Sequence, residues 1–197
     1  MDLSTYLSLH AKKLLIFDFD ETLAMLVTDW GKMLDEIYVD LLKIDKEIMT
    51  PYTPSTMSYQ LFNDLIKKHG SSVKKLLENH YQKAEGEDLK GINPNPELIN
   101  FIKNNNNYNY YIWSNNLSAT IIEVLEDAGI ADKFRTIISA NDNLFYKPDT
   151  SDIQKMIIGD KKDWLMIGDG ENDKLAANAL GIDFFFVDYF KHLEPSQ

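Results

Sequence analysis

The sequence predicts an α/β fold: a parallel sheet covered by helices on both faces, with a helical segment inserted near the N-terminus. Three observations predict it. Short, continuous apolar runs recur along the chain, helical patterns alternate with these runs from residue 96 onward, and residues 25–90 contain helical patterns but no convincing strand. Strands buried on both faces are apolar throughout, and strands that alternate with helices are typical of parallel sheets.

Five apolar runs are the predicted strands. The first is Leu14–Phe17, and it ends abruptly in acidic residues. The others are 110–113, 136–138, 164–167 and 184–187. Helices are predicted at 96–103, 118–128, 151–158 and 173–180. The last three patterns stop at a glycine, a frequent residue at the C-terminal end of a helix.

Residues 25–90 interrupt this alternation. Helical patterns cover 30–43, 59–69 and 73–83, with apolar residues on one face of each of the last two. We therefore expect an α/β core formed by residues 1–24 and 91–197, with residues 25–90 as a helical insert. An insert beside the end of a strand is well placed to act as a lid.

Composition narrows the functional classes. The 197 residues include no cysteine, which excludes disulfides, thiolate nucleophiles and cysteine-based metal sites. The formal net charge of −11 disfavours partners such as nucleic acid and anionic membranes, because both require basic patches. No apolar stretch approaches the ~18–20 residues needed to cross a bilayer, and the N-terminus has no signal-type apolar core. A cytoplasmic location is expected.

Residues suited to phosphate chemistry follow the predicted strands. In open α/β sheets, ligands bind beyond the carboxyl ends of the strands, so these residues should meet in one crevice. In chain order they are Asp18, Asp20, Ser114, Asn115, Lys147, Asp169 and Asp173. The occurrence of such residues after several strands is stronger evidence for a phosphate site than any one of the motifs alone.

Asp18 and Asp20 lie two residues apart directly after the first apolar run. In an extended segment such residues point to the same side, with Cα atoms ~6–7 Å apart. One carboxylate can attack phosphorus while the other protonates the leaving oxygen. Taken alone, the pair could also be a polar strand terminus or a helix cap.

Asp169 and Asp173 lie four residues apart across a turn that leads into a helix, where they can share one hard cation such as Mg²⁺. Lys174 and Leu180 exclude a calcium loop of the EF-hand type, because they occupy its required glycine and glutamate positions. Ser114 can hold a phosphate oxygen, and Lys147 can supply a positive charge. Taken alone, Asp173 and Ser114 could instead be helix caps, and Lys147 could be a solvated surface lysine.

These elements, in this order, resemble the four motifs of the haloacid dehalogenase (HAD) superfamily. The motif residues are Asp18-Phe19-Asp20-Glu21-Thr22, then Ser114, then Lys147-Pro148, then Gly168-Asp169 through Asp173. The resemblance implies a Rossmann-like core with a C1-type helical cap, and a Mg²⁺-dependent phosphatase that forms an aspartyl-phosphate. It also implies a small phosphorylated metabolite as substrate.

The resemblance assigns roles as well. Asp18 would be the nucleophile and a magnesium ligand. Asp20 would be the general acid and base, and its backbone carbonyl would bind magnesium. Asp169 would bind the metal directly, and Asp173 directly or through water. Ser114, with Asn115 beside it, and Lys147 would bind the phosphoryl group.

Other readings stay open. A dehalogenase of the same superfamily needs neither the second aspartate nor the metal pair, so Asp20 and Asp169 argue against it. A phosphomutase keeps Asp20 and the cap, and the sequence pattern separates it poorly from a phosphatase. A non-catalytic binding protein on this fold is a third reading. Within the insert, five residues are candidate substrate contacts that the sequence does not rank: Trp30, Lys32, Tyr59, His69 and Lys74. The motifs leave the oligomeric state open.

Overall fold

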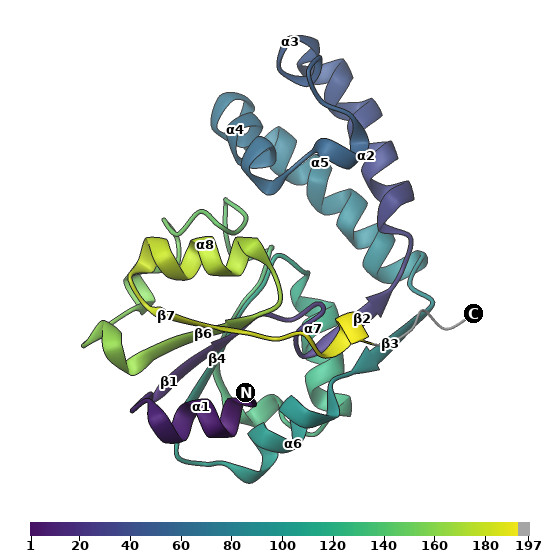
Figure 1. Cartoon of the computed structure of the whole chain (residues 1–197). Helices are drawn as coiled ribbons and strands as arrows, with labels where there is room; N and C mark the ends of the chain where they lie inside the picture. Colours follow the sequence, from purple (N-terminus) through teal and green to yellow (C-terminus); the bar gives the residue numbers. More distant parts are fainter. Residues whose placement is uncertain (193–197) are drawn as a thin grey trace.

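The core of the chain is a five-stranded sheet in which every neighbouring pair of strands is parallel, as seen in a computed structural model that describes residues 1–192 (Figure 1). The strand order is β5-β4-β1-β6-β7. The strands are β1 Leu14–Phe17, β4 Asn109–Trp113, β5 Phe134–Ile138, β6 Trp164–Gly168 and β7 Asp183–Phe186. The predicted α/β, Rossmann-like class is confirmed. Residues 193–197 of the predicted core lie outside the described residues.

Helices cover both faces of this sheet. Alternate residues of β1 face opposite layers: Leu15 and Phe17 belong to one apolar cluster, and Ile16 belongs to another. The first cluster includes residues of α1 Leu3–Leu9, α6 Pro96–Asn104 and α7 Ser118–Asp127, and the second includes residues of α8 Glu171–Leu180. The short helix α1 was not predicted.

The position of β1 at the centre of the sheet determines where a site can form. The chain continues from β1 through the insert to β4 and β5 on one side, and then crosses to β6 and β7 on the other. Connections that leave a strand in opposite directions open a crevice at its carboxyl end. Asp18 extends the ladder at that end, because its backbone N–H donates to the carbonyl of Ile167 at 2.8 Å.

Residues 30–87 form a helical bundle beyond the sheet (Figure 1). Its elements are α2 Trp30–Ile44, α3 Lys46–Met49, η1 Pro54–Thr56, α4 Tyr59–His69, α5 Ser71–Gln82 and the π-helix η2 Lys83–Glu87. The aspartate and serine side chains of Asp29, Asp45 and Ser58 cap the N-termini of α2, α3 and α4. Residues such as Ile37, Leu65 and Leu77 form an apolar cluster inside the bundle, and this cluster continues into Leu117 and Tyr146 of the core.

No helix within residues 1–192 is both long and apolar enough to cross a membrane.

The absence of a strand in residues 25–90 was a wrong prediction. Strand β2, Ala24–Val27, pairs antiparallel with β3, Gly91–Pro94, and the two strands connect the bundle to the core. Each strand has four residues. Their partners are more than sixty positions apart, so no local pattern indicates the pairing.

The helix predicted at 151–158 was also wrong. The segment contains only the 3₁₀ turn η4, Gln154–Met156. Two aspartate side chains accept hydrogen bonds from backbone N–H groups here: Asp149 from Ser151 at 3.1 Å, and Asp152 from Leu144 at 3.0 Å. The bond between Asp149 and Ser151 is local, and such local bonds favour turns over a helix.

Candidate active site

A buried lysine lies at the centre of the site. The Nζ atom of Lys147 is 2.5 Å from Oδ1 of Asp18 and 2.6 Å from Oδ1 of Asp173, and the residue is only 2% exposed. The ring of Trp113 lies 5.8 Å from the ammonium. A buried charge is costly unless it is paired, so these two carboxylates explain how the lysine can be buried.

Three carboxylates lie close together at the site, and two of them contact this lysine. One carboxylate oxygen from each of Asp18, Asp169 and Asp173 lies within 4.8 Å of the other two. The residues come from the end of β1, the end of β6 and the first turn of α8. Oxygen ligands in such a group fit a hard divalent cation such as Mg²⁺.

Gly168 makes room for this arrangement. A Cβ at this position would lie 2.5 Å from Cγ and 2.7 Å from Cβ of Asp173. The carboxylate of Asp173 also accepts a hydrogen bond from the backbone N–H of Gly170, at 3.2 Å. The last residue of β6 therefore has to be glycine for Asp173 to reach the lysine.

Asp20 has a different environment. It lines the same cavity, but its Oδ1 accepts from the backbone N–H of Leu26 at 2.8 Å and it is outside the three-carboxylate group. Burial raises the pKa of Asp20 to about 8, whereas burial, with a contribution from Asp173, raises the pKa of Asp18 to about 6. Near pH 7 the first carries a proton and the second is ionised, which is the division that an acid and a nucleophile require.

The remaining charges show how crowded the site is. Burial and then the charge of Asp18 raise the pKa of Asp169 to about 7. Burial disfavours the Lys147 ammonium, but the carboxylates of Asp173 and Asp18 outweigh it and raise the pKa of the lysine. A second cation approaches from the C-terminal segment, where Nζ of Lys191 donates to the backbone carbonyl of Asp169 at 2.8 Å.

Ser114 and Asn115 occupy different positions. The hydroxyl of Ser114 is buried and donates to Oδ1 of Asn116 at 2.8 Å, and Ser114 is not among the residues that line the cavity. Asn115 does line it, and its Oδ1 accepts from the backbone N–H of Lys147 at 2.7 Å. The side chain of Asn115 thus fixes the segment that carries the lysine.

Glu85 is a functional candidate that sequence reasoning missed. It belongs to the π-helix at the end of the bundle, and its carboxylate accepts from Nδ2 of Asn116 at 3.0 Å and from the backbone N–H of Leu117 at 3.1 Å. Burial raises the pKa of Glu85 to about 7. Through Asn116 it connects the bundle to Ser114. In the sequence, one acidic residue beyond a helical pattern gives no signal of this.

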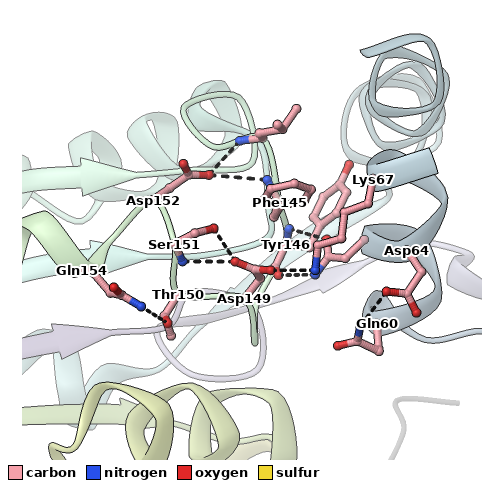
Figure 2. A network of polar contacts seen from close by, with 12 residues as sticks. Gln60, Asp64, Lys67, Phe145, Tyr146, Asp149, Thr150, Ser151, Asp152 and Gln154 are labelled. Carbon is pink, nitrogen blue, oxygen red and sulfur yellow. Dashed lines mark hydrogen bonds and ion pairs between the residues drawn. The ribbon is translucent and has the colours of Figure 1, made fainter. Parts of the chain in front are cut away.

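The segment that carries Lys147 is also attached to helix α4. The side chain of Asn63 donates to the carbonyl of Tyr146 at 2.8 Å and accepts from its N–H at 2.9 Å. Figure 2 shows the neighbouring contacts, in which Lys67 of α4 reaches Asp149 at 3.2 Å and Ser151 donates to the same carboxylate. The position of the lysine therefore depends on the bundle as well as on the sheet.

A cavity of about 470 Å³ separates the carboxylates from the bundle. Its core side includes Asp18, Asp20, Asn115, Lys147, Asp169 and Asp173. Of the seven site residues that the sequence predicts, the structure thus brings six to one cavity and leaves Ser114 behind it. The opposite side is formed by the bundle. This size lies within the range of ~300–1,000 Å³ typical of small-molecule sites.

The comparisons with known proteins agree with this geometry. The model of the haloacid dehalogenase-like hydrolase family matches residues 15–187. None of the curated protein sequences matches the chain. A protein from Bacteroides fragilis described as a candidate haloacid dehalogenase-like hydrolase is similar in structure, with 20% identity, a TM-score of 0.59, and coverage of 88% of this chain and 86% of that one.

Two further solved structures are similar. A candidate phosphoglycolate phosphatase from Lactobacillus plantarum is 16% identical, with a TM-score of 0.53 and coverage of 94% of this chain and 93% of that chain. A candidate β-phosphoglucomutase from Thermotoga maritima is 15% identical, with a TM-score of 0.50 and coverage of 94% and 87%. At such identities the similarity shows the fold.

Proposed function

The chain belongs to the haloacid dehalogenase-like hydrolase family, and from this premise we propose that it is a Mg²⁺-dependent phosphomonoester hydrolase that forms an aspartyl-phosphate on Asp18. The observation that carries the proposal is the arrangement around Lys147, where an ionisable aspartate, a buried ammonium and two further carboxylates meet at the bottom of one cavity. The similar structures include a candidate phosphatase, which supports the same reaction class.

The proposed reaction has two steps. A carboxylate oxygen of Asp18 attacks phosphorus, the bond between phosphorus and the leaving oxygen breaks, and Asp20 transfers its proton to that oxygen. Asp20 then takes a proton from water, which attacks the phosphorus, and inorganic phosphate and free Asp18 result. The raised pKa of Asp20, to about 8, supports its first role because it supplies a proton near neutral pH.

The residues present fit a magnesium ion. Asp18, Asp169 and Asp173 offer only oxygen, which Mg²⁺ prefers, and a backbone carbonyl of Asp20 is the further ligand that the family resemblance implies. When bound, the ion would neutralise charge on the phosphoryl group as it is transferred. Lys147 offsets part of the negative charge of the two carboxylates that it contacts, and Asn115 positions it.

We also propose that residues 25–90 are a cap domain and that residues 1–24 and 91–197 are the catalytic core. The antiparallel pair β2–β3 supports this boundary, because it is the stem from which the bundle extends. The bundle is packed around an apolar cluster and lines one side of the cavity, as expected of a cap that closes over a small phosphorylated metabolite.

A phosphomutase is the second candidate, since it would use the same aspartates and a cap. One of the similar structures is a candidate β-phosphoglucomutase, and this observation supports the phosphomutase as a second candidate function. Such an enzyme would return the phosphoryl group to a sugar, so a phosphosugar product would accumulate in place of free phosphate.

The test is turnover of p-nitrophenyl phosphate with Mg²⁺, with EDTA, and in the variant Asp18→Asn. Turnover that needs the metal and disappears in the variant is expected. Full activity in EDTA, or an Asp18→Asn variant as active as the wild type, would contradict the mechanism. If neither p-nitrophenyl phosphate nor several other phosphoesters are turned over, the result supports a non-catalytic binding protein instead.

A further inference from the structure

The cap side of the cavity is apolar and aromatic. The side chains that form this wall come from α2, from α4 and from the residues just before α4: Trp30, Met33, Leu34, Met57, Tyr59 and Phe62. Tyr81 of α5 and Ser58 complete it. No charged side chain of residues 25–90 lines the cavity among the residues that the structure describes. The wall therefore offers no ionic partner to a substrate.

The lysine and histidine candidates of the cap have partners elsewhere. Nζ of Lys32 is 2.9 Å from the carboxylate of Asp88, and Nε2 of His69 is 2.8 Å from that of Asp45. Lys74 donates to the backbone carbonyl at position 140, at 2.7 Å. None of these three side chains lines the cavity, whereas Trp30 and Tyr59, the two aromatic candidates, do.

The tyrosines do not make the wall much more polar. The hydroxyl of Tyr81 donates to that of Tyr59 at 2.9 Å, so the two groups bind each other. The ring of Tyr59 packs edge-to-face on Phe62, with centroids 5.9 Å apart. A sugar would bring several hydroxyl groups against this surface, where Ser58 and Tyr59 offer few polar partners for hydroxyl groups that have lost water.

The shortage of cationic side chains in the cavity also disfavours substrates that carry a second anionic group. Lys147 is the only cationic side chain that lines the cavity within residues 1–192, and two carboxylates already bind it. A substrate with a carboxylate or a second phosphate would place that group against the apolar wall with no cation to pair with. Desolvating such an unpaired charge is costly.

We propose, on the basis of the phosphatase activity proposed above, that this protein hydrolyses phosphomonoesters of apolar or aromatic alcohols in preference to sugar phosphates and phosphorylated carboxylic acids. The phosphoryl group occupies the floor formed by Asp18, Lys147 and Asp169, and the alcohol portion lies on the apolar wall. The released alcohol takes the proton of Asp20, and water replaces it on phosphorus.

Three esters of primary alcohols test the preference: 2-phenylethyl phosphate, glucose 6-phosphate and phosphoglycolate, each with Mg²⁺ and with free phosphate as the readout. All three leaving groups are primary alcohols, which reduces differences in intrinsic reactivity. The expected kcat/KM for 2-phenylethyl phosphate is at least about tenfold higher than for the other two, mainly through KM. Binding without turnover is measured in Asp18→Asn, where only 2-phenylethyl phosphate should raise the unfolding temperature.

A matched pair of variants locates the cause. Leu34→Lys puts an ammonium in the wall, and Val39→Lys puts one on the exposed side of the same helix, where Val39 is 51% exposed. Leu34→Lys should lower kcat/KM for 2-phenylethyl phosphate about tenfold and raise it for phosphoglycolate, whereas Val39→Lys should change neither.

The outcomes separate the two proposals. If the wild type prefers glucose 6-phosphate or phosphoglycolate, the inference about the wall is wrong and the phosphatase assignment stands. Equal effects of Leu34→Lys and Val39→Lys would also overturn the inference. If none of the esters, p-nitrophenyl phosphate included, releases phosphate, the proposed function fails and the substrate preference fails with it.

Discussion

The substitution Gly168→Ala tests the geometry of the site most directly. The added Cβ would lie 2.5 Å from Cγ of Asp173 and 2.7 Å from its Cβ, whereas carbon atoms pack best at ~3.5–4.0 Å. Asp173 must therefore move by about 1 Å, and its Cβ is held by helix α8. Overpacking of this kind costs ~1–3 kcal/mol of the free energy of unfolding.

The same movement should reduce activity. It withdraws the carboxylate of Asp173 from Lys147, 2.6 Å away, and from the N–H of Gly170. A displacement of about 1 Å in a catalytic group can lower turnover by ~10²-fold. The assays are urea unfolding and Mg²⁺-dependent release of phosphate from p-nitrophenyl phosphate.

Gly91→Ala is the matched control. A Cβ at Gly91, in strand β3, would meet no atom within 4 Å. This control should stay within about 0.5 kcal/mol of the wild type in stability and keep full activity. If Gly168→Ala behaves like Gly91→Ala in both assays, the close contact between β6 and Asp173 does not exist and the argument for the site is refuted.

Three other variants extend the test. Asn63→Leu removes both hydrogen bonds to the backbone of Tyr146 and should cost ~2–5 kcal/mol in urea unfolding, because two buried groups lose their partners; a loss under ~1 kcal/mol would mean that water replaces the amide. Lys147→Met should abolish turnover and lower stability by ~3–5 kcal/mol near pH 8, with a smaller loss at pH 5, where the unpaired carboxylates take up protons; equal losses at both pH values would contradict this. Burial raises the pKa of Glu85 from 4.5 to about 7, so the stabilisation from its bound proton is complete below pH 4.5 and disappears as the pH rises through 7. Between pH 5 and 8 the wild type should therefore lose ~2–3 kcal/mol more than Glu85→Gln in urea unfolding, and parallel pH profiles would rule out this role.

Local patterns were sufficient for the main elements of the core. Runs such as Leu14–Phe17 are apolar at every position because both faces of the strand are buried, and that requirement is visible in the residues themselves. The acidic residues after β1 and β6 were predictable for a similar reason. Parallel strands place their carboxyl ends at one edge, so the order of the elements brings Asp18 and Asp169 together.

The pairing of β2 with β3 and the absence of a helix at 151–158 were not predictable from local patterns. Strands β2 and β3 are short and find each other only across the whole cap. Segment 151–158 has a helical pattern, but Asp149, before the segment, accepts from the N–H of Ser151, and Asp152 accepts from the N–H of Leu144, in the preceding loop. In both cases the structure depends on residues that lie outside the segment whose pattern predicts a helix or a strand.

The sequence by itself determined the fold class and the types of residue at the strand ends, because burial on two faces and parallel topology follow from composition and order. Tertiary structure alone decided which side chains meet. It buried Lys147 between two carboxylates, placed Ser114 behind Asn116, brought Glu85 against the core and turned the cap's apolar side chains into the cavity. The reason is physical: these contacts depend on how the cap packs on the sheet, and that packing joins residues that are distant in the chain.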